Sequence, residues 1–179
     1  MVETGDDQEL IGRCRRGDQE AFTIMVGRYQ RMVYSVAYRM TYSAEDADDL
    51  AQEIFLKAWR EIGTLQAQAK FSAWLYRLSV NACLNWRKSA GRRGRLHEKY
   101  RVESEVNPHT EALGETAEKI HAALQQLDAR QRAAIVLTVY EGLSHAEAAR
   151  ALGCAETTIS WRIFAARRRL KQLLRDLPH

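Results

Sequence analysis

The spacing of Ala149, Gly153 and Ile159 constrains the fold of this chain more than any other feature of its sequence. Two short helices that cross steeply need a small residue where they approach, a residue that tolerates positive φ in the turn, and an aliphatic residue between them. The three residues meet these needs in that order. Ser144 and Glu147 form an S-x-x-E capping box that would begin the first helix. The pattern predicts a helix-turn-helix.

The second helix of this motif is expected from about Thr157 to Leu174, with one apolar face and one basic face. Its apolar stripe consists of Ile159, Ile163, Ala166, Leu170 and Leu173. Hydroxyl groups at a helix N-terminus and arginines suit phosphate, and a recognition helix presents its first turns to base edges. The candidate DNA-binding residues on this helix are Thr157, Thr158, Ser160, Trp161, Arg162, Phe164, Ala165, Arg167 and Arg168. The alternative is a plain helical hairpin with an arginine-rich tail.

Helical periodicity also runs through the first half of the chain. Apolar residues recur at three- and four-residue steps from Phe22 to Met40, and Asp18 is expected to cap that helix. Ser43 is expected to cap a third helix, and a fourth is predicted from Phe71 to Lys88. These patterns indicate a bundle of helices.

Two further helices are expected before the helix-turn-helix. The first, from Thr116 to Leu127, carries Ile120 on its apolar stripe. Asp128 with Gln131 resembles a capping box, and the helix that follows is expected to reach Tyr140. No segment shows the two-residue alternation of a strand, so the predicted fold class is all-α.

The helical segments are interrupted once by a long polar stretch. Periodicity fails from about Ser89 to Glu115, where glycine, asparagine and proline punctuate the sequence. We therefore expect two small helical domains, at residues 1–90 and 116–179, joined by a flexible linker at residues 91–115.

Charge is unevenly distributed, although the formal net charge is only +4. Basic residues concentrate at residues 85–101 and 144–175, whereas acidic residues crowd the stretch from Glu45 to Glu53. This separation suggests a polyanionic partner for the basic segments and a protein partner for the acidic one. The alternative is that these segments are merely solvated helix faces.

The composition argues against several other classes of protein. Cys14, Cys83 and Cys154 lie far apart and lack metal-ligand spacing, so neither a metal site nor a cofactor is expected. Their odd number, without a signal peptide, favours the reducing cytoplasm. No apolar run approaches the roughly 20 residues that span a bilayer. No catalytic triad or phosphate-binding glycine loop stands out, so the chain is not expected to be an enzyme.

Longer stretches of the sequence resemble a known family. The strings SHAEAARALG (144–153) and TISWRIFAAR (158–167) are similar to region 4 of the extracytoplasmic-function sigma factors, which belong to the sigma-70 superfamily of bacterial RNA polymerase subunits. The strings DADDLAQEIFLKAW (46–59) and FSAWLYRLSVN (71–81) resemble region 2 of that family, and GDQEAF (17–22) is a weaker match. The resemblance covers nearly the whole chain.

This resemblance implies a role in transcription initiation. A sigma factor binds core RNA polymerase, recognises the −10 and −35 promoter elements and promotes DNA melting. The polymerase-binding residues that the resemblance implies are Asp49, Gln52, Glu53 and Lys57, which would dock on the β′ clamp helices. Region 4 would meet the β flap. An anti-sigma factor that clamps both domains is a further implied partner.

The resemblance also assigns roles in binding the −10 element. The loop Gly63–Lys70 would hold a base flipped out of the duplex, and Arg77 and Asn81 would contact the melted strand. The basic residues implied to hold upstream duplex phosphates are Arg87, Lys88, Arg92 and Arg93. Trp74 would either stack on a base or pack in the core.

The sequence departs from the family pattern at Trp161, where small polar or basic residues are usual. An indole cannot make a bidentate contact with a base, so Trp161 would press on a thymine methyl or a sugar, or pack on the preceding helix. Phe164 is ambiguous in the same way. A stand-alone helix-turn-helix regulator is the alternative function, and it would not need the exposed docking residues Asp49, Gln52 and Glu53.

Overall fold

Every regular element in the part of the chain that the structure describes is a helix, which confirms the all-α prediction. The computed structural model describes residues 6–66, 69–97 and 114–175. The first half contains α1 (Asp7–Arg15), α2 (Gln19–Thr41), α3 (Ala44–Glu61), the short 3-10 helix η1 (Ile62–Thr64) and α4 (Phe71–His97). The second half contains α5 (Gly114–Gln125), α6 (Ala129–Ile135), the π-helical turn η2 (Val136–Tyr140), α7 (His145–Leu152) and α8 (Glu156–Leu173).

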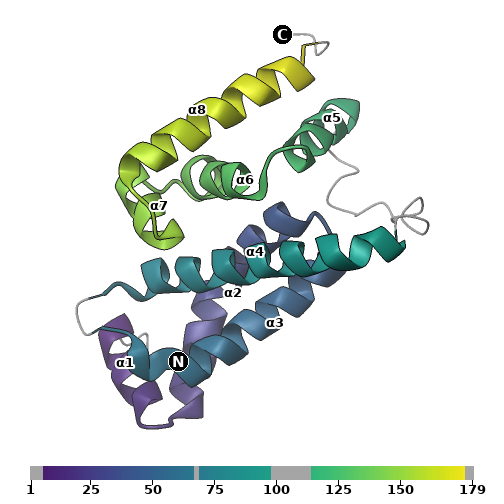
Figure 1. The fold of residues 1–179 in the computed structure, drawn as a ribbon. Helices are drawn as coiled ribbons and strands as arrows, with labels where there is room; N and C mark the ends of the chain where they lie inside the picture. The colour runs from purple at the N-terminus through teal and green to yellow at the C-terminus, as the bar shows by residue number, and fades with distance from the viewer. Residues whose placement is uncertain (1–5, 67–68, 98–113, 176–179) are drawn as a thin grey trace.

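The helices form two lobes that pack on each other along α4 (Figure 1). In the N-terminal lobe, α1 to α4, helix α2 packs against its three neighbours. In the C-terminal lobe, α5 to α8, helix α8 packs against α6 and α7. Helix α4 also contacts α6 and α7. One side of α4 therefore closes the N-terminal lobe while another supports the C-terminal lobe.

Side-chain caps begin two helices of the N-terminal lobe, as the sequence predicts. The Asp18 carboxylate accepts a hydrogen bond from the Ala21 N–H at 3.0 Å, and the Ser43 hydroxyl accepts one from the Asp46 N–H at 3.2 Å. Each bond satisfies a backbone donor that the first helical turn leaves without an intrahelical partner. Between the helices, Tyr42 turns the chain at a φ of 60°.

Aromatic side chains pack inside the N-terminal lobe and connect its helices. The ring centroids of Phe22 and Trp59 lie 4.9 Å apart, which joins α2 to α3. Phe71 begins α4 and lies 5.1 Å from Tyr29 of α2 and 5.7 Å from Trp74. These tilted pairs are within the range where aromatic contacts stabilise beyond simple burial. Trp74 thus packs against the core, which favours the structural alternative for this residue.

The helix-turn-helix has the geometry that its sequence predicts. The Ser144 hydroxyl accepts from the Glu147 N–H, and the Glu147 carboxylate accepts from the Ser144 N–H at 2.9 Å, which completes the capping box. The Ser144 N–H, followed by the Ser144 hydroxyl, lowers the pKa of Glu147. Gly153 ends α7 at a φ of 61°, and Ile159 is fully buried on α8.

A buried arginine joins the two lobes. Arg132 of α6 is only 2% exposed and donates to the carbonyls of Leu124 at 2.9 Å, of Gln125, and of Met40 across the junction at 3.0 Å. These carbonyls lie at the C-terminal ends of α5 and α2, where backbone acceptors lack helical donors and partial negative charge collects. Burial lowers the pKa of Arg132 to about 10, so it stays charged at neutral pH. Its guanidinium lies 5.0 Å from the centre of the Tyr42 ring.

Glu141 makes a second polar bridge across the junction. Its carboxylate accepts from the Ser35 hydroxyl of α2 at 2.7 Å and from the Tyr76 hydroxyl of α4 at 3.1 Å. Burial, and then the nearby Glu141 carboxylate, raise the pKa of Tyr76, which keeps its phenol a donor at neutral pH. Arg39 of α2 lies 4.5 Å from the centre of the Tyr140 ring. Directed polar contacts therefore hold the lobes together in addition to apolar packing.

The end of α4 differs from the prediction. The sequence predicts a helix that ends at Lys88, but α4 continues to His97, so the predicted end is wrong. The prediction gave too much weight to the glycines of this stretch, since a glycine inside a helix costs only about 1 kcal/mol relative to alanine. Most of the expected linker, residues 98–113, lies outside the described residues. The division of the chain into domains stays a prediction.

The C-terminal lobe departs from the prediction in three details. Ile120 is 37% exposed, because α5 lies at the edge of the lobe (Figure 1). Asp128 caps α6 by accepting from the Arg130 N–H at 2.9 Å, in place of the predicted capping box with Gln131. The expected helix up to Tyr140 finishes in the π-helical turn η2, and the N–H of Glu141 donates to the carbonyl of Val136, five residues earlier, at 3.0 Å.

Candidate nucleic-acid interface

Four exposed residues of α8 form a ridge opposite the buried side of the helix. Thr157, Trp161, Phe164 and Arg168 follow one another at steps of four, three and four residues, so they share one helix face. The buried residues on the other side are Ile159, Ile163 and Ala166. Trp161 and Phe164 are 64% and 65% exposed. Trp161 therefore does not pack on the preceding helix.

The other candidates on α8 differ in exposure. The Ser160 hydroxyl donates to the Glu156 carbonyl at 3.2 Å and lies 3.0 Å from Nδ1 of His145, so it ties α8 to the start of α7. Arg162 is half-buried, and its guanidinium lies 3.5 Å from Sγ of Cys154. The remaining candidates are Thr158 and Ala165, which are half-buried, and Arg167, which is exposed. Every residue of the α8 ridge is therefore exposed, whereas the rest of the predicted set mixes exposed and half-buried residues.

The candidates on α4 divide into three groups. Arg77, Asn81 and Lys88 are exposed and fall on one side of the helix at steps of four and seven residues. Arg87 is half-buried and lies close enough to Arg132 to lower its pKa, which places Arg87 at the junction between the lobes. The candidates Arg92 and Arg93 fall within the last turns of α4, and their side chains lie outside the described part of the structure.

The predicted base-binding loop, Gly63–Lys70, follows α3 directly. It begins in η1 and is anchored by Ile62 and Leu65, both buried. The Arg15 guanidinium of α1 donates to the Leu65 carbonyl. Residues 67–68 of the loop lie outside the described residues. The anchors place the loop beside the start of α4, whose exposed residue Arg77 lies two turns further along.

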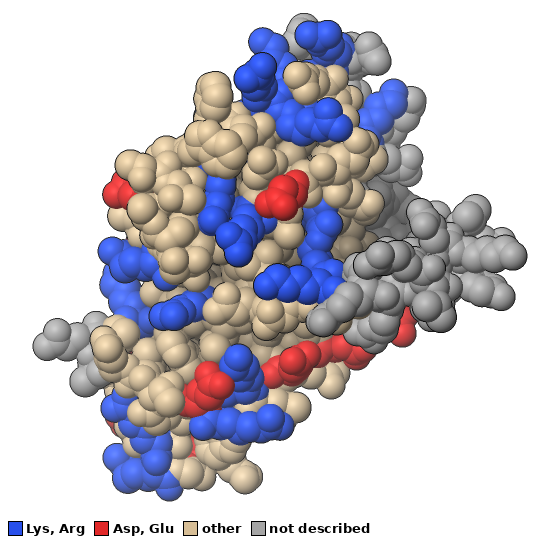
Figure 2. All heavy atoms as spheres, viewed as in Figure 1, with Lys and Arg blue, Asp and Glu red and all other residues tan. Residues whose placement is uncertain are grey.

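The acidic residues of α3 form an exposed face on the N-terminal lobe. Asp49, Gln52, Glu53 and Lys57 are all exposed, as the sequence predicts for a docking face. Figure 2 shows a row of acidic side chains along the N-terminal lobe, whereas basic side chains gather over the C-terminal end of α8. The acidic face of α3 and the basic end of α8 are thus separate surfaces on different lobes, which suits two different partners.

One residue of the α3 face escaped the sequence prediction. Leu56 is 57% exposed and shares this face, because it follows Gln52 by four residues and Glu53 by three. Leu56 thus adds one apolar side chain to the predicted docking face, as the centres of protein interfaces commonly require. Leu56 does not fall on the apolar stripe of Leu50, Ile54 and Ala58, and this position in the sequence could have indicated that it is exposed.

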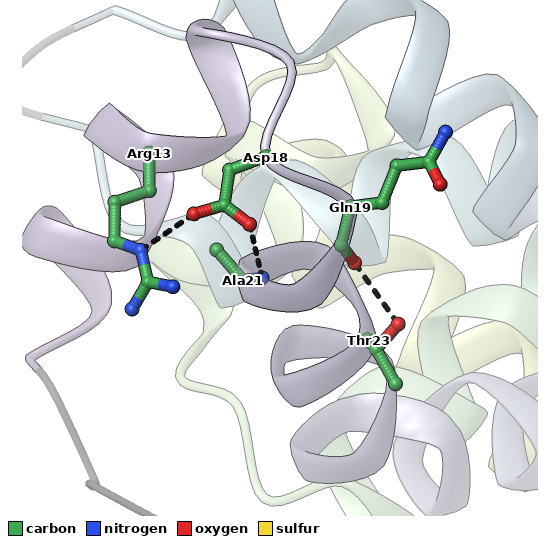
Figure 3. Close-up of polar contacts among 5 residues, drawn as sticks. All are labelled: Arg13, Asp18, Gln19, Ala21 and Thr23. Carbon is green, nitrogen blue, oxygen red and sulfur yellow. Dashed lines mark hydrogen bonds and ion pairs between the residues drawn. The ribbon is translucent and has the colours of Figure 1, made fainter.

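The weaker family-like string GDQEAF has a structural role (Figure 3). Asp18 caps α2 through the Ala21 N–H and pairs with Arg13 Nε of α1 at 2.8 Å. The Ala21 N–H, and then the Arg13 side chain, lower the pKa of Asp18. Thr23 adds a bond from its hydroxyl to the Gln19 carbonyl at 2.9 Å. These contacts fix the turn between α1 and α2.

Two models of protein families match the chain in the order that its lobes follow. Sigma-70 region 2 matches residues 25–93, and sigma-70 region 4 matches residues 117–170. The chain belongs to the sigma-70 family. The region 2 match contains α3 and α4 up to residue 93, and the region 4 match contains the helix-turn-helix up to Leu170 of α8. The resemblance read from the sequence is confirmed.

Relatives over the full length place the chain among the extracytoplasmic-function sigma factors. It is 33% identical to the ECF RNA polymerase sigma-E factor of Escherichia coli, over 99% of this chain and 98% of that protein. It is 32% identical to the RNA polymerase sigma-H factor of Pseudomonas aeruginosa, with the same coverage. It is 38% identical to the sigma factor SigM of Mycobacterium tuberculosis, over 94% of this chain and 84% of that protein.

Solved structures of sigma factors share this architecture. CnrH, in complex with the cytosolic domain of CnrY, is 27% identical, with a TM-score of 0.71 over 96% of this chain and 99% of that chain. RpoE of Bartonella quintana, in complex with the anti-sigma factor NepR, is also 27% identical, with a TM-score of 0.72 over 88% of this chain and 98% of that chain. The fold seen here is therefore that of a two-domain sigma factor.

Two further properties concern metals and membranes. Within residues 6–66, 69–97 and 114–175, no group of histidine, cysteine or acidic side chains is placed to hold a metal ion. Among the same residues, no helix combines the length and apolarity needed to cross a bilayer.

Proposed function

We propose that this sigma factor binds core RNA polymerase through α3 and promoter DNA through α4 and α8. The observation that carries the proposal is the separation of two exposed surfaces. The α3 face is acidic, and the α8 ridge is aromatic and basic. A polymerase subunit that selects promoters needs both surfaces at once, whereas an independent DNA-binding regulator needs only the second.

The proposed contact with polymerase uses Asp49, Gln52, Glu53 and Lys57 on the β′ clamp helices. Lys57 lies 3.9 Å from Glu61 on the same helix, a weak exposed pair that can rearrange on docking. Leu56 would supply the apolar centre of this contact. The C-terminal lobe would rest on the β flap, which would orient α8 toward upstream DNA.

The proposed contact with the −10 element uses the start of α4 and the loop before it. Arg77 and Asn81 would touch the melted strand, and the loop Gly63–Lys70 would hold a flipped base. The residues proposed to hold duplex phosphates further along α4 are Arg87, Lys88, Arg92 and Arg93. Arg87 would have to leave the junction between the lobes to do so.

The proposed contact with the −35 element uses the first turns of α8 in the major groove. Thr157 would meet phosphate at the helix N-terminus, and Arg168 would meet phosphate further along. The remaining residues assigned to this contact are Thr158, Ser160, Trp161, Arg162, Phe164, Ala165 and Arg167. Polymerase would carry out all chemistry, so the chain itself would not be an enzyme, and it would act in the cytoplasm beside its partner.

An anti-sigma factor is the proposed regulatory partner. The solved complex of RpoE with NepR supports this, because that sigma factor shares the architecture described here. The anti-sigma factor would clamp the two domains, cover both the α3 face and the α8 ridge, and so prevent assembly of holoenzyme.

Run-off transcription with purified core polymerase and a library of bacterial genomic fragments tests the proposed function. Specific transcripts are expected only when this chain is added, and not when Glu53→Lys is added in its place. Transcription that does not depend on the chain, with fragments still retained by the chain alone, would contradict the proposal and favour the stand-alone regulator.

A further inference from the structure

Trp161 and Phe164 are the two most exposed large apolar side chains among the described residues. They are three residues apart on α8, so they are neighbours on one face of the helix. They occupy the middle of the α8 ridge, between Thr157 and Arg168. The opposite face of α8 carries the buried residues Ile159, Ile163 and Ala166, so the two exposed rings do not stabilise the lobe. Paired exposed apolar groups of this kind mark a binding surface.

The charge around the pair indicates a nucleic acid as its occupant. Arg167, Arg168 and Arg169 begin three residues after Phe164, and all three are exposed. Three adjacent cations suit the phosphate backbone that lines the major groove. The ridge lies on the second helix of a helix-turn-helix, which is the helix that enters that groove.

The chemistry of the pair limits what it can recognise there. Neither an indole nor a phenyl ring can make the paired hydrogen bonds by which arginine reads guanine or asparagine reads adenine. The thymine 5-methyl is the one apolar group that unmodified bases present in the major groove. Three residues of helix rise about 4.5 Å, close to the roughly 3.4 Å between base pairs, so the two rings reach neighbouring base pairs.

We propose that Trp161 and Phe164 select thymine at two neighbouring base pairs of the −35 element through contact with the 5-methyl groups. The proposal rests on the proposed function and adds the identity of the bases to it. Burying one methyl group changes affinity by about fourfold, so the two contacts together are worth roughly fifteenfold. Because neither ring carries charge, this part of the affinity is independent of salt.

The test uses holoenzyme made from core polymerase and the full chain. Upstream elements are first selected from a random duplex library, and each preferred thymine is then replaced by uracil, which removes only the methyl group. Wild-type holoenzyme is expected to lose about fourfold in affinity for each contacted thymine replaced. Trp161→Ala and Phe164→Ala are each expected to bind the thymine and uracil duplexes equally at one of the two positions.

Arg168→Ala is the matched control on the same ridge. It is expected to weaken binding of both duplexes and to lower the salt dependence by about one phosphate contact, while the preference for thymine over uracil stays. Circular dichroism and core binding check that each variant is folded.

Three outcomes would overturn the proposal. Equal affinity of wild-type holoenzyme for thymine and uracil duplexes would show that the holoenzyme binds the promoter without a methyl contact. Alanine variants that keep the wild-type preference, while losing affinity for a protein partner, would assign the pair to that partner. If the holoenzyme selects no sequence at all, the result would contradict both the proposed function and this inference.

Discussion

Large aromatic side chains have opposite surroundings in the two lobes. In the N-terminal lobe, Phe71 is buried against Tyr29 and Trp74 and joins α4 to α2. In the C-terminal lobe, Trp161 and Phe164 project into solvent from α8. The same residue types therefore stabilise one lobe and are exposed on the other, where we propose that they bind DNA. Substitutions in the two places should separate stability from function.

The largest expected effect is on the free energy of unfolding of Phe71→Ala. Removing this ring leaves a cavity at the start of α4, and we expect a loss of about 3–5 kcal/mol in urea denaturation. Trp161→Ala should change the same free energy by less than about 0.5 kcal/mol, because its side chain is mostly exposed. Similar losses of unfolding free energy in both variants would contradict the contrast between a buried ring in one lobe and an exposed ring in the other.

The junction between the lobes gives the next largest effect. Arg132→Met should lower the free energy of unfolding by roughly 2–3 kcal/mol, because three buried carbonyls lose their charged donor. The loss is partly offset, because the variant no longer has to desolvate a guanidinium group. The measurement is the urea midpoint. Arg130→Met, at an exposed position on the same helix, is the control and should shift the midpoint little. Equal midpoints would show that Arg132 does not hold the junction.

A smaller effect, on binding alone, is expected at the α3 face. Glu53→Lys should weaken binding to core polymerase by about tenfold, or 1.4 kcal/mol, without a change in the urea midpoint, because the residue is exposed. Fluorescence titration of core polymerase with labelled protein measures this affinity. Glu9→Lys makes the same charge change on α1 and should bind as the wild type does. A loss of affinity in both variants would indicate a general charge effect instead of a docking face.

The smallest expected effect concerns the capping box of α7. The pKa of Glu147 is lowered from its ordinary value of 4.5 by the Ser144 N–H and hydroxyl, so its ionised form stabilises the fold. That stabilisation is present above pH 4.5 and is lost as pH falls through the lowered pKa. The melting temperature of Glu147→Gln should therefore lie slightly below that of the wild type at pH 7 and converge with it in acid. A difference that persists in acid would contradict the charge-based cap.

Local features of this fold could be predicted from the sequence. Asp18, Ser43 and Ser144 begin helices because their side chains satisfy backbone donors a few residues away, and Gly153 ends one because it accepts positive φ. Such rules act over one helical turn. Glycines inside α4 misled the prediction, because a local preference of about 1 kcal/mol does not decide where a long helix ends.

Contacts between distant residues could not be predicted in the same way. Arg132 reaches Met40 from 92 residues away, and Glu141 reaches Ser35 from 106 residues away. The sequence shows an ordinary basic and an ordinary acidic residue at these positions. Whether Trp161 is buried or exposed was equally open, because both states fit the helical pattern.

The most direct test of the account is the affinity of one selected promoter duplex for the chain alone and for holoenzyme. If the α3 face binds polymerase while the α8 ridge binds DNA, the promoter duplex should bind holoenzyme about a hundredfold more tightly than it binds the chain alone. Glu53→Lys should remove most of that gain. Equal affinity with and without core polymerase would contradict the division of labour between the two lobes.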